Sequence, residues 1–177
     1  MKVLGIDPGT RVTGYGVVEN GRNGRLIHVC DGEIRGNPRD GLPERLLKIS
    51  DSVKKVMEEF SPDCVSVESV FFGPNVRSAV ALSHARGVIL LAAAGCGVKI
   101  FEYGATRIKQ AVTGYGGATK EQVQKMVSML LKTGEKRSPD ASDALAAAIC
   151  HIHHSCGLSA ALLRHDGRGF PRERKER

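Results

Sequence analysis

The order of strand-like and helix-like segments is the feature that most restricts how this chain can fold. Three strand-like segments come first, at residues 3–6, 13–19 and 26–34, and a Gly- and Asn-containing stretch at 20–24 joins the last two. Short connections of this kind link antiparallel strands. The start of the chain therefore predicts an antiparallel meander, whose first strand ends at Asp7 before the turn residues Pro8 and Gly9.

Helix-like and strand-like segments alternate in the next part of the chain. Apolar residues recur at helical spacing from about residue 40 to 60, and a long apolar segment follows at 75–96. The strand-like segments 64–68 and 98–101 come after these helices, and a strand reached through a helix usually runs parallel to an earlier strand. We therefore predict an α/β fold, a five-stranded mixed sheet with its first three strands antiparallel, flanked by helices. The uncharged stretch 87–98 is too short to span a membrane and should form a buried helix.

Two further helices have recognisable ends. Thr119 and Gln122 form a capping-box pattern before an apolar stripe that we expect Gly134 to close. Ser138 and Pro139 are an N-cap and first-turn pair that opens the last helix. Helical periodicity fades near residue 157, which predicts a single domain over 1–157 and a basic, flexible tail over 158–177.

Four acidic residues are the candidate catalytic groups. Asp7 and Glu68 end the first and fourth strands, and parallel neighbours place such residues at one edge of the sheet. Asp140 and Asp143 are three residues apart, so they share one face of the last helix near its start. Such a cluster needs a cation, and oxygen ligands favour Mg²⁺, with two ions suited to phosphodiester hydrolysis. Taken singly, the two helix acids could instead complement the helix dipole, Asp7 could be a turn residue, and Glu68 could end its strand in solvent.

Charge and cysteine content restrict the partner and the compartment. The 26 Lys and Arg residues exceed the 19 Asp and Glu residues, which gives a net charge of +7 and suits a polyanionic partner without proving one. The five cysteines are odd in number and have apolar neighbours, which argues against a disulfide framework. The first residues lack the apolar region of a secretory signal. We expect a cytoplasmic protein with no membrane partner.

Several motifs together resemble the RuvC family of Holliday junction resolvases. They are residues 5–9 (GIDPG), 12–16 (VTGYG), 68–71 (ESVF), 85–88 (ARGV), 101–103 (FEY), 120–123 (KEQV) and 140–145 (DASDAL). The resemblance implies a ribonuclease-H-like fold and a homodimer that makes symmetric, magnesium-dependent nicks in four-way DNA junctions, with manganese able to substitute. It also implies that the four carboxylates bind the metal, and that a branch-migration motor of the RuvA and RuvB type is a partner. The chain departs from the family pattern at Ser83 and His84, which leaves a local packing or partner contact open.

The resemblance also suggests residues that bind DNA. Phe71 follows Glu68 in a Gly- and Pro-containing loop, where an exposed ring can stack on an unpaired base, although core packing is the alternative. Lys109 and Lys120 can reach phosphates, and Arg77 is a further candidate, although surface lysines are often only solvated.

Other classes of protein explain less of the sequence. An actin-like ATPase would share the turn after Asp7 but needs two large domains, and a catalytically silent DNA-architecture protein would not need four aligned acids. A zinc site built from His151, His153 and His154 lacks the spacing of a closed tetrahedral set.

Overall fold

The computed structural model describes residues 1–69, 76–134 and 137–165, with side chains described throughout except at 77 and 158–165. The elements follow in the order β1 (Lys2–Asp7), β2 (Val12–Asn20), η1 (Arg22–Gly24), β3 (Leu26–Arg35), α1 (Leu42–Phe60), β4 (Cys64–Glu68), α2 (Val76–Gly95), β5 (Lys99–Tyr103), α3 (Ala105–Thr113), α4 (Lys120–Leu130) and α5 (Pro139–His165). The predicted strands and helices are therefore present, and α3 is an additional helix whose bounds the sequence pattern did not indicate.

The five strands form one mixed sheet in the order β3-β2-β1-β4-β5. Strands β1, β2 and β3 are antiparallel, whereas β4 is parallel to β1 and β5 is parallel to β4. This arrangement confirms the predicted five-stranded sheet. Ile6 pairs with Val67 in the β1–β4 register, so the next residues along, Asp7 and Glu68, end neighbouring strands at the same edge.

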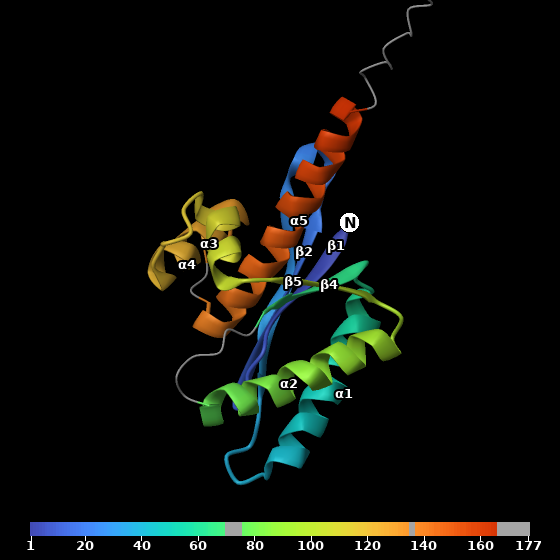
Figure 1. Ribbon diagram of the computed structural model, residues 1–177, viewed down its shortest axis with the longest axis vertical. Coiled ribbons are helices and arrows are strands. Elements are labelled where there is room, and N and C mark those ends of the chain that lie inside the picture. The colour runs from blue at the N-terminus through green and yellow to red at the C-terminus, as the bar shows by residue number, and fades with distance from the viewer. Residues whose placement is uncertain (70–75, 135–136, 166–177) are drawn as a thin grey trace, which may run out of the picture.

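Helices cover both faces of the sheet. Helix α5 crosses one face with α3 and α4 beside it, and α1 and α2 lie on the other face (Figure 1). The core is correspondingly divided in two. Val3 packs with residues of α5, while Leu4 packs with Val53 and Ile89 on the side of α1 and α2. Strand β1 is buried on both faces, which explains its nearly continuous apolar sequence.

Helix α2 covers the sheet with only one side. Ala85 and Ile89 are completely buried, but Val80 and Leu91 are 50% and 73% exposed. The expectation of a buried helix is therefore wrong for the outer side of α2. By length and composition alone, residues Ser78–Gly95 could cross a membrane, yet in this fold the helix packs against α1 and the sheet.

The predicted helix starts are present, and one predicted helix end is wrong. The Gln122 backbone N–H donates to Thr119 Oγ1, and the Thr119 N–H donates to Gln122 Oε1, so the capping box is complete. Ser138 Oγ accepts a hydrogen bond from the backbone N–H of the first turn of α5 at 3.3 Å. Helix α4 ends at Leu130, and Lys132 with φ 53° takes the left-handed conformation that we had expected at Gly134. Helix α5 continues past residue 157 to His165.

Candidate active site

Helix α5 lies against the backbone of the sheet because glycines face it. A β-carbon on Gly5 would lie 1.9 Å from the carbonyl oxygen of Ala144, and one on Gly14 would lie 2.0 Å from the carbonyl oxygen of Asp140. No larger residue fits at either position unless the helix moves away. Glycine inside a strand often marks such a close approach. These two residues therefore set the depth at which α5 packs.

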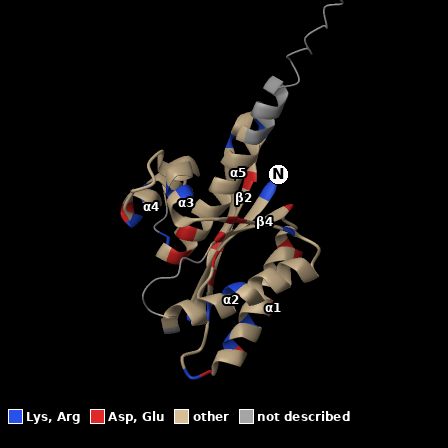
Figure 2. Cartoon of the chain, in the orientation of Figure 1, with Lys and Arg blue, Asp and Glu red and all other residues tan. Residues whose placement is uncertain are grey.

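The same contact brings the acidic residues to one place. Gly14 is the partner of Asp7 in the β1–β2 register, so the backbone of Asp140 touches the residue that lies opposite Asp7. Glu68 ends the adjacent strand β4. Asp143 lies on the next part of α5 and, like Asp140, is half-buried. Figure 2 shows acidic segments at the first turn of α5 and on the strands beside it.

Two polar contacts hold the start of α5 against the sheet. Ser66 Oγ in β4 donates a buried 2.7 Å hydrogen bond to the carbonyl oxygen of Ala147. Arg137, one residue before the N-cap of α5, donates from Nε to Asp31 of β3 at 2.6 Å, and its side chain is only 7% exposed. Our sequence reasoning missed these positioning residues. The available signals were a serine in an apolar strand and glycines in neighbouring strands.

The carboxylates influence one another electrostatically. The pKa of Asp7 is raised from 3.8 to about 7, first by burial and then by the charges of Asp143, Glu68 and Asp140 in that order, while the charge of Lys120 lowers it. Burial also raises the pKa of Glu68, with Asp143 as the next cause. Mutual repulsion of this kind requires that the acids lie close together.

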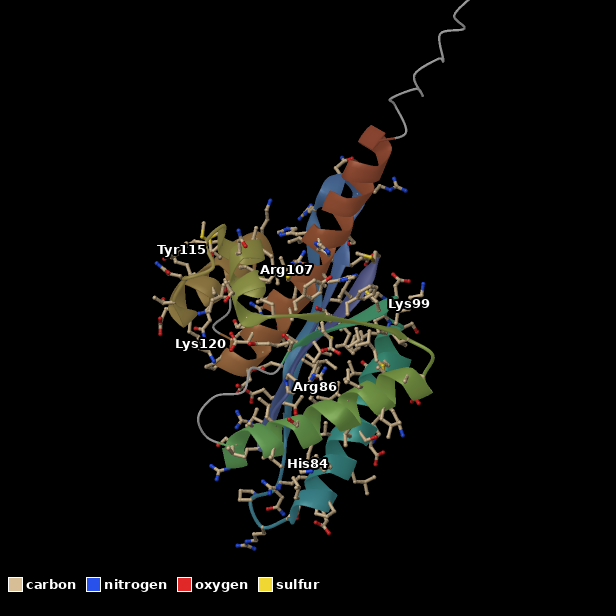
Figure 3. All side chains as sticks on the ribbon, in the orientation of Figure 1. His84, Arg86, Lys99, Arg107, Tyr115 and Lys120 are labelled. Carbon is tan, nitrogen blue, oxygen red and sulfur yellow. The ribbon has the colours of Figure 1, made fainter. Side chains whose placement is uncertain are left out.

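Lys120 partly compensates this negative charge. Its Nζ lies 2.7 Å from Asp143 Oδ2, and the hydrogen bond to Asp143 is the main reason that the pKa of Lys120 is raised. The capping box places Lys120 in the first turn of α4, and Figure 3 shows it facing the start of α5. Lys120 lines a cavity of about 180 Å³ together with Glu68 and Asp143, and Lys109 of α3 lines it too. Two lysines therefore lie beside the acids.

The donor set fits a hard cation. The acids supply carboxylate oxygens, the ligands that Mg²⁺ prefers, and a bound cation would oppose the burial and the neighbouring negative charges that raise the pKa of Asp7. Among the described residues, no three His, Cys, Asp or Glu side chains already converge into a ready-made metal site. Side-chain adjustment around a cation would therefore be needed to complete the coordination.

The remaining candidates divide into two groups. Phe71 lies outside the described residues, and so does the side chain of Arg77, whose backbone belongs to α2. The three histidines of α5 each have a separate partner: His151 Nδ1 pairs with the Tyr103 hydroxyl, His153 Nδ1 with the carbonyl oxygen of Ala111, and His154 Nδ1 with Arg107.

A mixed sheet in this strand order, with acids where β1, β4 and α5 meet, defines a protein of the ribonuclease-H-like class. The profile of the family described as "Crossover junction endodeoxyribonuclease RuvC" matches residues 3–151. The chain belongs to the RuvC family, which confirms the resemblance that the motifs indicated.

Individual relatives and solved structures agree with this assignment. A RuvC protein of Pelobacter propionicus is 48% identical over 167 residues, which cover 93% of this chain and 94% of that protein. A RuvC protein of Geobacter sulfurreducens is 49% identical over 153 residues, which cover 86% of this chain and 93% of that protein. The structure of Thermus thermophilus RuvC has a TM-score of 0.82 at 34% identity and covers 89% of this chain and 96% of its own. The structure of the same protein in complex with a Holliday junction substrate has a TM-score of 0.83 at 35% identity and covers 88% of this chain and 94% of its own.

Proposed function

We propose that this chain is a crossover junction endodeoxyribonuclease, which resolves four-way DNA junctions in recombination and repair by metal-dependent hydrolysis of phosphodiester bonds. Membership of the RuvC family and the similarity to a RuvC structure solved with a Holliday junction support the substrate. The observation that carries the proposal is that the four carboxylates come together where β1, β4 and α5 meet, close enough for Asp143, Glu68 and Asp140 each to add to the raised pKa of the buried Asp7. A cluster that resists ionisation is costly to keep unless a cation and a phosphate use it.

The four carboxylates, Asp7, Glu68, Asp140 and Asp143, would hold magnesium in this proposal. Magnesium, as two ions per subunit and with manganese able to substitute, would neutralise charge on the phosphate and lower the pKa of water. The chain itself orients the site, because the close packing of α5 on Gly5 and Gly14 fixes the spacing between the helix acids and the strand acids.

Lys120 and Lys109 are proposed to bind the phosphate of the strand that is cut. A cation at the carboxylates competes with Lys120 for Asp143, so the ammonium group becomes available to an anion beside it. Lys109 lines the same cavity and its positive charge acts on Glu68. We further propose that Phe71 stacks on an unpaired base near the crossover and that Arg77 contacts the DNA backbone.

We propose that the active form is a homodimer that pairs through α2. The exposed residues Val80, His84, Gly87, Leu91 and Ala94 follow one another at intervals of four and three, which places them in one stripe along the outer side of the helix. Figure 3 shows His84 on this helix. A β-carbon on Gly87 would meet nothing within 4 Å, so a second helix has room to approach there. Two copies related by a two-fold axis match a junction with two equivalent strands.

Size measurement tests the dimer. Leu91→Arg places a charge in the middle of the stripe and should convert dimer to monomer in light scattering, with paired nicking lost. Leu47→Arg is the matched control, because Leu47 is also exposed, at 63%, but lies on α1. A Leu91→Arg protein that remains dimeric would exclude this interface.

A branch-migration motor of the RuvA and RuvB type and a cytoplasmic location complete the proposal, and both rest on the family.

The direct test uses a synthetic four-way junction and a linear duplex of the same sequence, each with and without magnesium. We expect paired nicks in the junction only, and only with the metal. Asp7→Asn should still bind the junction but not cut it, whereas Asp51→Asn, at an exposed position of α1, should cut normally. Cleavage by the Asp7→Asn protein at the normal rate would overturn the assignment.

A second pair of variants tests the lysine. Lys120→Ala should slow cleavage by at least about tenfold, since hydrogen bonds that stabilise charge in the transition state contribute about 10²–10³ in rate in other enzymes. Lys125→Ala is the matched control on the same helix, because Lys125 is exposed and is not among the residues that line the cavity beside Asp143. Equal cleavage rates for the two variants would exclude a catalytic role for Lys120.

A further inference from the structure

We propose that Arg11 and Arg45 form a second binding surface for the DNA backbone, on the opposite side of the carboxylates from Lys109 and Lys120. This inference rests on the proposed function and assigns residues that neither the motifs nor the acidic site had indicated. The two lysines belong to α3 and α4, on the α5 face of the sheet, whereas Arg45 belongs to α1 on the other face. Arg11 lies in the turn between β1 and β2.

Two adjoining cavities make up this surface. One, of about 890 Å³, is lined by the turn after β1, by Arg45, by residues of α2 and, at one end, by Asp140. The other, of about 660 Å³, is lined by Arg35, the turn 36–38 and Arg45. Both cavities share Arg11, Val12 and Arg45, so together they form one groove that begins at a candidate catalytic acid.

The groove carries positive charge. Arg11 is exposed, and Arg45 is half-buried with its Nε donating to the carbonyl oxygen of Gly41 at 3.3 Å. Arg35 pairs with Glu33, so its charge is partly compensated. Among the described residues that line the two cavities, Asp140 is the single acid. An anion entering from the catalytic edge therefore meets the guanidinium groups of Arg11 and Arg45.

The loop contacts hold this surface in place before any ligand binds. The Gly36 backbone N–H donates to the carbonyl oxygen of Arg11 at 2.9 Å, which ties the end of β3 to the turn after β1. A β-carbon on Gly36 would lie 3.0 Å from Arg45 Cδ and 3.2 Å from the carbonyl oxygen of Thr10. The glycine thus allows the turn to pack directly on the stem of Arg45.

A DNA backbone is the ligand that best fits these features. Guanidinium groups bind phosphate through two parallel hydrogen bonds, and the groove is larger than a single ion requires. Its inner end is Asp140, so a strand whose phosphate lies at the carboxylates enters the groove as it leaves the site. Cations on both sides of the acids would hold that strand before and after the position of cleavage, which fixes its register.

The test measures junction binding without cleavage. Fluorescence anisotropy in EDTA, at several salt concentrations, compares the wild-type protein with the double variant Arg11→Ala/Arg45→Ala. We expect affinity to fall by at least about tenfold and the slope of log affinity against log salt to decrease by about 1.8, since each lost phosphate contact contributes about 0.9. The matched control is Arg22→Ala/Arg25→Ala, which removes the same charge from exposed positions around η1, at the far end of the β2–β3 hairpin.

Two further variants separate binding from folding. Arg11→Lys/Arg45→Lys keeps the charge and should retain the salt slope. Arg11→Ala alone leaves the Arg45–Gly41 hydrogen bond intact and should reduce the slope by about 0.9. This single variant therefore tests the groove even if the double variant does not fold. Neutral methylphosphonate linkages on one side of the cleavage position should weaken binding by the wild-type protein but not by the double variant.

The outcomes distinguish this inference from the function on which it rests. In one outcome, the wild-type protein nicks junctions while the Arg11 and Arg45 variants bind them with normal affinity and a normal salt slope. That result would overturn the proposed role of the groove but not the proposed function. A wild-type protein that does not nick junctions would overturn the function. An equal loss of affinity in the Arg22 and Arg25 control would show general charge attraction and would also overturn the groove.

Discussion

Replacing Asp7 with Asn should stabilise the metal-free protein at pH 8, although the change removes a residue that we propose to be essential. Burial and the neighbouring acids Asp143 and Glu68 make the ionised form of Asp7 unfavourable in the folded state. Asparagine has nearly the same shape and no charge. The variant therefore avoids the cost of holding a carboxylate in these surroundings.

The magnitude follows from the pKa. Because the folded protein keeps a proton on Asp7 up to about pH 7, while the unfolded chain releases it near the ordinary value of 3.8, stability falls as pH rises through this interval. At about 1.4 kcal/mol for each pH unit, the interval corresponds to an upper value of about 4 kcal/mol. Asp7 keeps some contact with solvent, so we expect Asp7→Asn to gain about 2–3 kcal/mol at pH 8 and almost nothing near pH 4.

Urea unfolding in EDTA at both pH values measures this gain, and Asp51→Asn serves as the control. Excess magnesium should then raise the stability of the wild-type protein more than that of the variant, because a ligand of the folded state stabilises it by mass action. An Asp7→Asn protein that is less stable than wild type at pH 8 in EDTA would refute the reasoning. So would a difference that is the same at both pH values.

Three other substitutions test the position of α5. Gly5→Ala should cost about 3 kcal/mol and abolish cleavage, because its β-carbon would overlap the carbonyl oxygen of Ala144; a normal urea midpoint would show that the helix can move away freely. Arg137→Met leaves Asp31 with His28 but without its buried guanidinium partner and should cost about 2–3 kcal/mol in the same assay, and a neutral result would mean that the Arg137–Asp31 ion pair does not hold the helix. Ser66→Ala removes one buried hydrogen bond and should lower the free energy of unfolding by about 1 kcal/mol, whereas an increase in stability would contradict its anchoring role.

Some features of the fold were predictable because their causes are local. Thr119 and Gln122 satisfy each other's backbone donors within one turn, so the start of α4 could be predicted from four residues. The end of α4 could not, because Lys132 adopts a left-handed conformation that the sequence suggested for Gly134. The outer side of α2 was also wrongly expected to be buried, since a helix that is apolar on all sides does not reveal which side the chain itself covers.

The sequence alone determined the family and the mixed sheet and indicated four acids as candidates, because strand ends, turns and helix caps depend on neighbouring residues. Only the tertiary structure decided how closely the acids approach. The raised pKa values of Asp7 and Glu68, the ion pair of Lys120 with Asp143 and the groove at Arg11 all depend on residues that are distant in the chain. Electrostatic interactions and close packing vary over a few ångströms, and glycine contacts between α5 and the sheet fix those distances.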